Sequence, residues 1–209
     1  IFFNSFRMDT PLYGGRGPQG VSGVMTGRDG DFRAKHSAVK LFLSNDLDIQ
    51  GIVTKAIESP EHKYDVVKFA KDVAIHHGCL GGELEPLPSS HNRVQLDKDR
   101  LDPLGLPLPR IHYELDDYVK NGMTVWLKFA HDLIEKMGAH QVSSSIAHSS
   151  HHPSGTARMG LDMKLSVVNE NCRSHDHDNL YILGGSVFPS MGTANPTLTI
   201  AALSLRLAE

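Results

Sequence analysis

Three short segments near the end of the chain carry most of the information about its architecture. They read HPSGTARMG (residues 152–160), NLYILGGSVFP (179–189) and NPTLT (195–199). The apolar run 180–183 is followed by two glycines, which predicts a buried strand that ends in a tight turn. Asn195 is a favoured N-cap and Pro196 a favoured first helical residue, so a helix is expected to follow. The end of the chain is therefore predicted to form a strand, a loop and a helix.

Histidines are concentrated just before and between these segments. Six of the 13 histidines fall between His140 and His177. The segment 174–178, SHDHD, mixes imidazoles and carboxylates that could in principle bind zinc or copper. The H-x-x-H-H spacing at 148–152 differs from that of a helical zinc motif, and Pro153 predicts that His152 leaves a regular element. A metal site is therefore disfavoured. The alternative is a structural role, in which several of these histidines, His148 and His177 among them, are turn residues.

Two helices are predicted upstream. Between residues 117 and 137, apolar side chains recur at helical spacing, and Gly138 stands where a terminating glycine is favoured. The aromatic and methionine side chains of this helix are expected to face the core. A second helix is predicted from Pro60, with Ser59 as its N-cap, to about residues 76–78.

The remaining segments indicate strands and loops. The apolar segments 38–42 and 49–54 are expected to be strands, or a strand and a helical turn, and alternation at Val94 and Leu96 predicts another strand. Residues 14–30 hold seven of the 19 glycines and are predicted to be loop. Their G-x-G-x-x-G match at 15–20 is interpreted as accidental, because Pro18 and further glycines disfavour the helix that a dinucleotide-binding motif needs. The order of elements predicts the α+β class.

Composition excludes several classes of protein. The 209 residues are 40% hydrophobic and 22% charged, which is ordinary for a globular protein and excludes disorder and collagen. The net charge is −3 with no long basic run, so nucleic-acid binding is disfavoured, and no apolar run approaches the ~18 residues of a membrane helix. Cys79 and Cys172 are too few for a disulfide framework, and their pairing stays open. The chain begins at Ile1 without a signal peptide, which suggests a fragment of a longer protein.

Taken in order, H-x-x-G-T-x-R-M-G, the NLY segment, GGSVFP and NPTLT resemble the C-terminal signature of the glucose-methanol-choline (GMC) oxidoreductases over residues 152–207. The segments VQLD (94–97) and GLP (105–107) are similar to a strand and turn of the family's substrate domain, whereas residues 1–90 match only loosely. The resemblance implies a substrate-domain segment over residues 1–160, with a mixed or antiparallel sheet and helices. It further implies that residues 161–209 return to complete an FAD-binding α/β domain.

The resemblance also implies a reaction. A base removes the hydroxyl proton of an alcohol while hydride leaves the same carbon for N5 of FAD, and polyols, sugars and sugar acids are the favoured substrates. His152 matches the family's catalytic histidine, and Asn195 matches the second active-site position, although Asn195 could instead only cap a helix. Arg158 is predicted to be structural and Met159 to lie in the core. Flavin contacts are expected from six residues: Gly184, Gly185, Ser186, Asn195, Pro196 and Thr197.

The sequence has no strand-turn-helix motif for binding the ADP part of FAD. The fragment alone is therefore not expected to hold FAD or to be active, and its expected partners are an alcohol substrate and a missing N-terminal FAD-binding part. No metal and no nucleic acid are expected, and the residues indicate neither the electron acceptor, which a membrane could carry, nor the localisation. Two alternatives are an interaction module that has lost its cofactor and, with less support, a His-rich metal-dependent hydrolase.

Overall fold

The structure is a computed structural model that describes residues 1–12, 20–24, 27–45, 49–58, 65–147 and 152–209. The chain divides into two compact units. The first comprises Ile1–Leu84 and Asn121–Ser149, and the second comprises Glu85–Lys120 and Ser150–Glu209.

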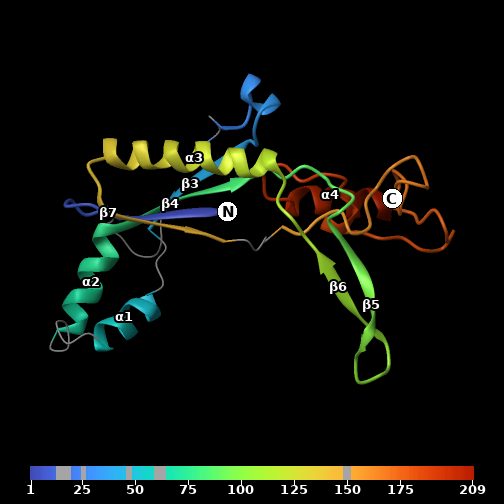
Figure 1. The fold of residues 1–209 in the computed structure, drawn as a ribbon, viewed down its shortest axis with the longest axis horizontal. Helices are drawn as coiled ribbons and strands as arrows, with labels where there is room; N and C mark the ends of the chain where they lie inside the picture. The colour runs from blue at the N-terminus through green and yellow to red at the C-terminus, as the bar shows by residue number, and fades with distance from the viewer. Residues whose placement is uncertain (13–19, 25–26, 46–48, 59–64, 148–151) are drawn as a thin grey trace. The chain divides into compact units, whose positions relative to one another are not determined.

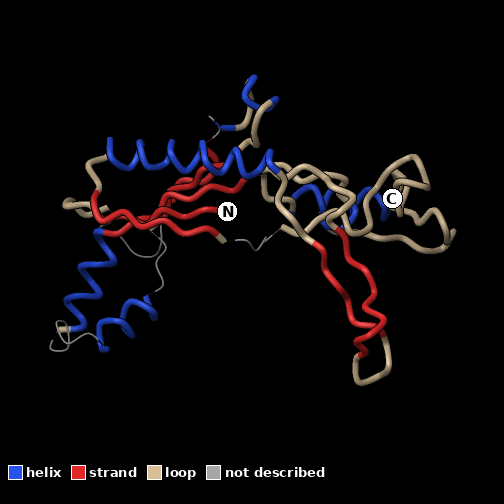
Figure 2. Tube along the Cα trace, in the orientation of Figure 1, coloured by secondary structure: helices blue, strands red, loops and turns tan. Residues whose placement is uncertain are grey.

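The first unit is built on a five-stranded antiparallel sheet in the order β2-β3-β4-β1-β7. The strands are β1 (Phe2–Arg7), β2 (Gly20–Val24), β3 (Val39–Ser44), β4 (His77–Leu84) and β7 (His140–Ile146); they are drawn in red in Figure 2. Glycines in the central strand β4 leave room for aromatic rings of the neighbouring strands. A Cβ on Gly82 would lie 2.4 Å from Cζ of Phe2, and one on Gly81 would lie 2.1 Å from Cζ of Phe42. The glycines are thus needed by this sheet, although they disfavour strands in general.

The long helix α3 (Asp117–Lys136) packs along one face of this sheet (Figure 1). The core between them consists of fully or nearly fully buried side chains: Phe2, Phe6, Val39, Leu41, Leu80, Trp126, Ala130 and Ile134. After the helix, Gly138 adopts φ +75°, its amide donates to the Glu135 carbonyl, and the Ala139 amide donates to the Ile134 carbonyl. These two hydrogen bonds form the pattern that is typical of a glycine C-cap. The predicted helix and its terminating glycine are confirmed.

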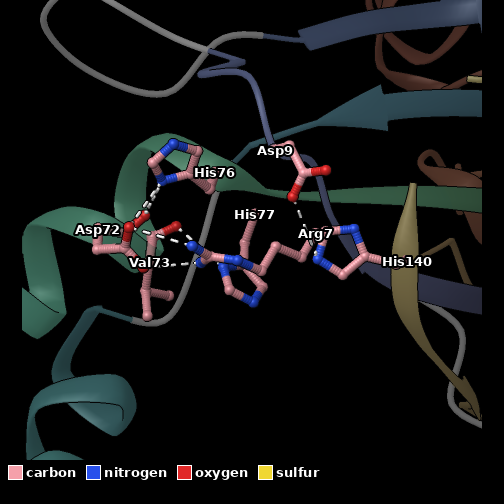
Figure 3. A network of polar contacts seen from close by, with 7 residues as sticks. All are labelled: Arg7, Asp9, Asp72, Val73, His76, His77 and His140. Atoms are coloured by element: carbon pink, nitrogen blue, oxygen red, sulfur yellow. Dashed lines mark hydrogen bonds and ion pairs between the residues drawn. The ribbon is translucent and has the colours of Figure 1, made fainter. Parts of the chain in front are cut away.

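Helices α1 (Ile49–Glu58) and α2 (Val66–His76) lie at one end of the sheet, and polar contacts hold α2 there (Figures 1 and 3). Arg7 of β1 forms a bidentate ion pair with the Asp72 carboxylate, at N–O distances of 2.8 and 3.1 Å. His76 Nδ1 lies 3.0 Å from the same carboxylate, and His140 Nε2 lies 3.7 Å from Asp9. The Arg7 hydrogen bond lowers the pKa of Asp72, whereas burial and then Arg7 lower the pKa of His77.

The second unit contains a two-stranded ribbon, β5 (Arg93–Leu101) and β6 (Pro107–His112), which points away from the segments around α4 (Thr197–Ala208) in Figure 1. The Asp102 carboxylate accepts the Leu104 and Leu106 amides at 2.8 and 2.9 Å and so closes the turn of the ribbon. Most of residues 152–196 form turns and isolated bridges, with one short helix, η3 (Gly185–Val187).

The α+β class is confirmed, but several elements differ from the sequence-based predictions. β2 lies inside the segment predicted to be loop, and β1, β4 and β7 were not predicted. Residues 49–58 form a helix, and α2 begins at Val66 with the Asp65 side chain as its cap, while the predicted cap Ser59 lies outside the described residues. The predicted strand 180–183 is wrong, because this segment forms only one isolated bridge, from Tyr181 to Arg173.

Two further observations concern the cysteines and the membrane. Cys79 and Cys172 are both free thiols. Among the helices of the described ranges, none combines the length and apolar character that crossing a membrane requires.

Candidate active site

The two predicted site segments 152–160 and 184–188 lie side by side in the second unit. The Ala157 amide donates to the Ser186 carbonyl at 2.9 Å, and the Met159 amide donates to the Val187 carbonyl at 2.7 Å. Gly155, with φ +80°, turns the first segment so that a Cβ there would lie 3.5 Å from the Phe188 carbonyl oxygen. Two motifs separated by about 30 residues are thus joined by backbone hydrogen bonds, which do not depend on the side chains involved.

The paired glycines meet two different requirements. Gly184 has φ +102°, which side-chain-bearing residues rarely adopt, and open space surrounds its missing side chain. Gly185 has no such backbone requirement, but a Cβ there would lie 2.7 Å from the Pro153 carbonyl oxygen. The first glycine is therefore needed for the turn, and the second for the close approach of the segment that begins at His152.

A pocket of about 370 Å³ opens beside this pair of segments. Its walls are Met159 from the first segment, residues 187–192 from the second, and Ala194, Asn195, Pro196, Thr199 and Leu203 from the start of α4. Most of the lining is apolar, and Asn195, Ser190 and Thr199 contribute polar groups. An apolar cavity with a few polar groups is typical of a site for an organic ligand.

Helix α4 begins at this pocket. Pro196 is its N-cap residue, and its first helical bond runs from the Ile200 amide to the Pro196 carbonyl. Asn195, which was predicted to be the N-cap, lies directly before Pro196. The amides of the first turn have no partners within a helix, and a helix N-terminus has roughly half a positive charge, so this end of the pocket favours negative charge.

The structure places the predicted site residues as follows. His152 is half-buried and directly precedes Pro153, Gly184–Ser186 are part of the paired segments, and Asn195 and Pro196 line the pocket. Thr197 is the first residue of α4. Met159, predicted to lie in the core, is half-buried and lines the same pocket as Asn195.

Sequence analysis missed the contributions of Phe188, Ser190 and Thr199 to the pocket. Thr199 could have been found, since it lies in the first turn of the helix that was predicted to begin beside Asn195. Phe188 and Ser190 belong to an irregular segment whose direction no periodicity reveals.

Other polar residues near the site have structural contacts. His175 Nε2 lies 3.1 Å from the Gly160 carbonyl and 2.9 Å from Ser166 Oγ, and Arg158 Nε donates to the Leu165 carbonyl. Because Ser166 Oγ donates to the Asp162 carbonyl at 2.6 Å, His175 Nε2 is the donor to both of its partners. Within the described ranges no three His, Cys, Asp or Glu side chains are grouped to hold a metal ion. His148 and His151 lie outside those ranges.

Comparison with known proteins identifies this arrangement. A family model described as GMC oxidoreductase matches residues 88–204, which include both paired segments and the pocket. The chain is 31% identical over 206 residues to the fructose dehydrogenase large subunit of Gluconobacter japonicus, covering 98% of this chain and 38% of the relative. It is 38% identical over 137 residues to a 6'''-hydroxyparomomycin C oxidase of Streptomyces lividus, covering 62% of this chain and 25% of the relative.

A third relative is a 2-methyl-1,2-propanediol dehydrogenase of Mycolicibacterium austroafricanum, 30% identical over 128 residues, which are 60% of this chain and 23% of the relative. The chain thus spans 38% or less of the length of these three relatives. The family model covers more than half of the chain, from the ribbon to helix α4. The chain belongs to the GMC oxidoreductase family.

Proposed function

We propose that this chain forms the C-terminal part of an FAD-dependent enzyme that oxidises an alcohol CH–OH group, with sugars and polyols as its substrate class. The names of the relatives support this class, because they describe a fructose dehydrogenase, a 6'''-hydroxyparomomycin C oxidase and a 2-methyl-1,2-propanediol dehydrogenase. The structural observation that carries the proposal is the pairing of 152–160 with 184–188 beside a pocket that Asn195 lines.

The residues present fit a flavin at this pocket. Its largely apolar lining suits a flat aromatic ring system, open space at Gly184 lets a group approach the backbone, and the N-terminal end of α4 favours an anionic group. Of the six residues proposed to contact the flavin, Asn195 and Pro196 line this pocket, whereas Gly184, Gly185, Ser186 and Thr197 adjoin its walls in the sequence. Bound FAD would supply the hydride acceptor.

The chain's own residues would handle the proton and the substrate oxygen. The His152 imidazole accepts the hydroxyl proton as the carbon gives up a hydride and the C–O bond becomes a carbonyl. An imidazole suits this task because it titrates near neutral pH. The Asn195 amide donates a hydrogen bond to the same oxygen and orients the alcohol without adding a charge.

The end of the chain supports a further part of the proposal, namely that residues 161–209 complete a domain whose remainder lies elsewhere in the polypeptide. Helix α4 is largely apolar, yet none of its residues is buried, and Leu198 and Leu205 are 83% and 69% exposed. Tyr181, in the apolar run 180–183, is 50% exposed. A helix that is apolar on most sides is normally buried, so further polypeptide is expected to cover these side chains.

The test uses the longer flavin-containing polypeptide that includes this chain. His152→Ala should slow reduction of the bound flavin by an alcohol about 10²- to 10⁴-fold, while the visible flavin spectrum persists. His177→Ala is the matched control, since the His177 side chain is exposed, while its backbone amide donates to Ser174 Oγ and its carbonyl accepts from the Leu180 amide. Equal reduction rates in the wild type and in His152→Ala would refute the base assignment.

Asn195→Ala separates its proposed role from a structural one. The variant should lower turnover, whereas a loss of thermal stability with unchanged turnover would favour a purely structural role for Asn195. The alternative of a module without a cofactor is tested by the same protein. If the longer polypeptide, purified with added FAD, shows no flavin absorbance, the enzyme proposal fails and the interaction module is favoured.

A further inference from the structure

We infer that Gly185 is a positioning residue for His152: its missing side chain lets the Pro153 carbonyl approach and so sets where the His152 imidazole lies. This inference rests on the proposed role of His152 as the base. It assigns to Gly185 a task within the chain, separate from any contact with a cofactor.

The contact between Gly185 and Pro153 lies next to His152 along the chain. Pro153 directly follows His152, so a displacement of the Pro153 carbonyl moves the peptide to which His152 is joined. The backbone hydrogen bonds of Ala157 and Met159 lie five and seven residues after His152. The approach of Pro153 to Gly185 is thus much closer to the imidazole along the chain than either hydrogen bond.

A side chain at position 185 would overlap with the Pro153 carbonyl oxygen. A Cβ there would lie 2.7 Å from the Pro153 carbonyl oxygen, whereas ordinary van der Waals contact begins at 3.4 Å. The atom it meets belongs to the backbone, so no rotamer change relieves the overlap. One of the two segments must move by about 0.7 Å. Because Gly185 does not have a positive φ, alanine adds no backbone strain, and within this chain the overlap with Pro153 is the effect of the substitution.

A displacement of this size is large enough to lower kcat. Proton transfer requires the base within about 2.6–3.2 Å of the proton-bearing atom, and a misplacement of about 1 Å can cost 10²-fold in rate. A shift of about 0.7 Å at the neighbouring residue is therefore expected to lower kcat roughly 10-fold or more. KM should change less than kcat, because Gly185 itself is not proposed to contact the alcohol.

The experiment compares Gly185→Ala with Gly78→Ala in the flavin-containing protein. Gly78 lies in β4 of the first unit, and a Cβ there would meet Cζ of Phe6 at the same distance, 2.7 Å. The control therefore has an equally close overlap in the unit that does not contain His152. Gly185→Ala should lower kcat and displace the pH profile of kcat/KM, whereas Gly78→Ala should lower the thermal midpoint and leave the pH profile in place.

A second readout does not depend on activity. The rate at which diethyl pyrocarbonate modifies His152, followed by peptide mass spectrometry as a function of pH, reports the environment of this imidazole directly. Gly185→Ala should change that rate at least about 3-fold, while Gly78→Ala should not change it. Ala157→Pro removes the amide that bonds to the Ser186 carbonyl and leaves Gly185 in place, so it should change the rate less than Gly185→Ala does. Each variant is measured below its own thermal midpoint, so that the rate reports the folded protein.

The outcomes separate the two proposals. If Gly185→Ala leaves both the pH profile and the His152 modification rate unchanged in a folded protein, Gly185 does not position His152. If His152→Ala leaves flavin reduction unchanged while Gly185→Ala still alters modification of His152, the base assignment fails and the positional coupling stands.

Discussion

Replacing Ile134 by alanine tests whether the face of α3 that packs on the sheet stabilises the first unit. Ile134 is fully buried in the cluster that also contains Phe2, Leu80 and Trp126. The substitution removes three carbon groups, which are worth about 2.4 kcal/mol of transfer free energy at about 0.8 kcal/mol each. The cavity left behind adds to this loss, so the free energy of unfolding should fall by about 3–4 kcal/mol.

The assay is urea unfolding followed by tryptophan fluorescence. Trp126 is the single tryptophan of the chain and lies in the same cluster as Ile134, so the signal reports this unit. With a urea dependence of about 1–3 kcal/mol per molar, the midpoint should fall by roughly 1 M or more.

Val125→Ala on the same helix is the control. Val125 is 43% exposed, and alanine is the better helix former, so its free energy of unfolding should change by less than about 0.5 kcal/mol. Equal midpoint shifts for Ile134→Ala and Val125→Ala would refute the packing of α3 described above.

Three further predictions follow from contacts in the first unit and from the two thiols. Asp72→Asn should lower the thermal midpoint at neutral pH by a few degrees. Arg7 lowers the pKa of Asp72 in the folded state, so the stability that Asp72 contributes is lost as the pH falls through that pKa. Below that pKa, the thermal midpoints of the wild type and of Asp72→Asn should converge. Different midpoints at a pH where Asp72 is protonated would contradict this. Burial raises the pKa of Cys79, so at pH 8 iodoacetamide should modify it more slowly than it modifies the exposed cysteine of a short peptide, and the buried Cys172 should react only on unfolding. Asn4→Ala should cost about 2 kcal/mol in the urea assay, since the fully buried Asn4 bonds to the Leu80 carbonyl and accepts from a serine hydroxyl, and a cost below about 0.5 kcal/mol would show that these bonds are not formed.

The sequence predicted helices better than strands, and the reason is physical. A helix closes its hydrogen bonds within four residues, so the spacing of apolar side chains and the terminating Gly138 were sufficient to place α3. A strand needs a partner that is distant in sequence. β4 was missed because glycines disfavour a strand in the sequence, and their role, which is to leave room for the rings of Phe2 and Phe42, is evident only once the neighbouring strands are in place.

The serine-rich strand β7 was missed for a similar reason. Its Ser144 hydroxyl donates to the buried Asn4 of β1 and lies 2.8 Å from His131 Nε2 of α3. These partners are 140 and 13 residues away, so no local pattern indicates them. The run 180–183 shows the converse error, since its apolar residues predict a strand, but the described residues pair it only through Tyr181.

The family, the class of fold and the segments that form the candidate site could all be inferred from residue order. Motifs such as HPSGTARMG and GGSVFP are contiguous, so they can be recognised without knowledge of any distant contact. Three-dimensional packing was needed to show that Pro153 approaches Gly185, that Met159 and Asn195 share one pocket, and that Pro196 occupies the N-cap. Each of these facts is a distance between atoms that the folded backbone brings together, and such distances depend on the whole course of the chain.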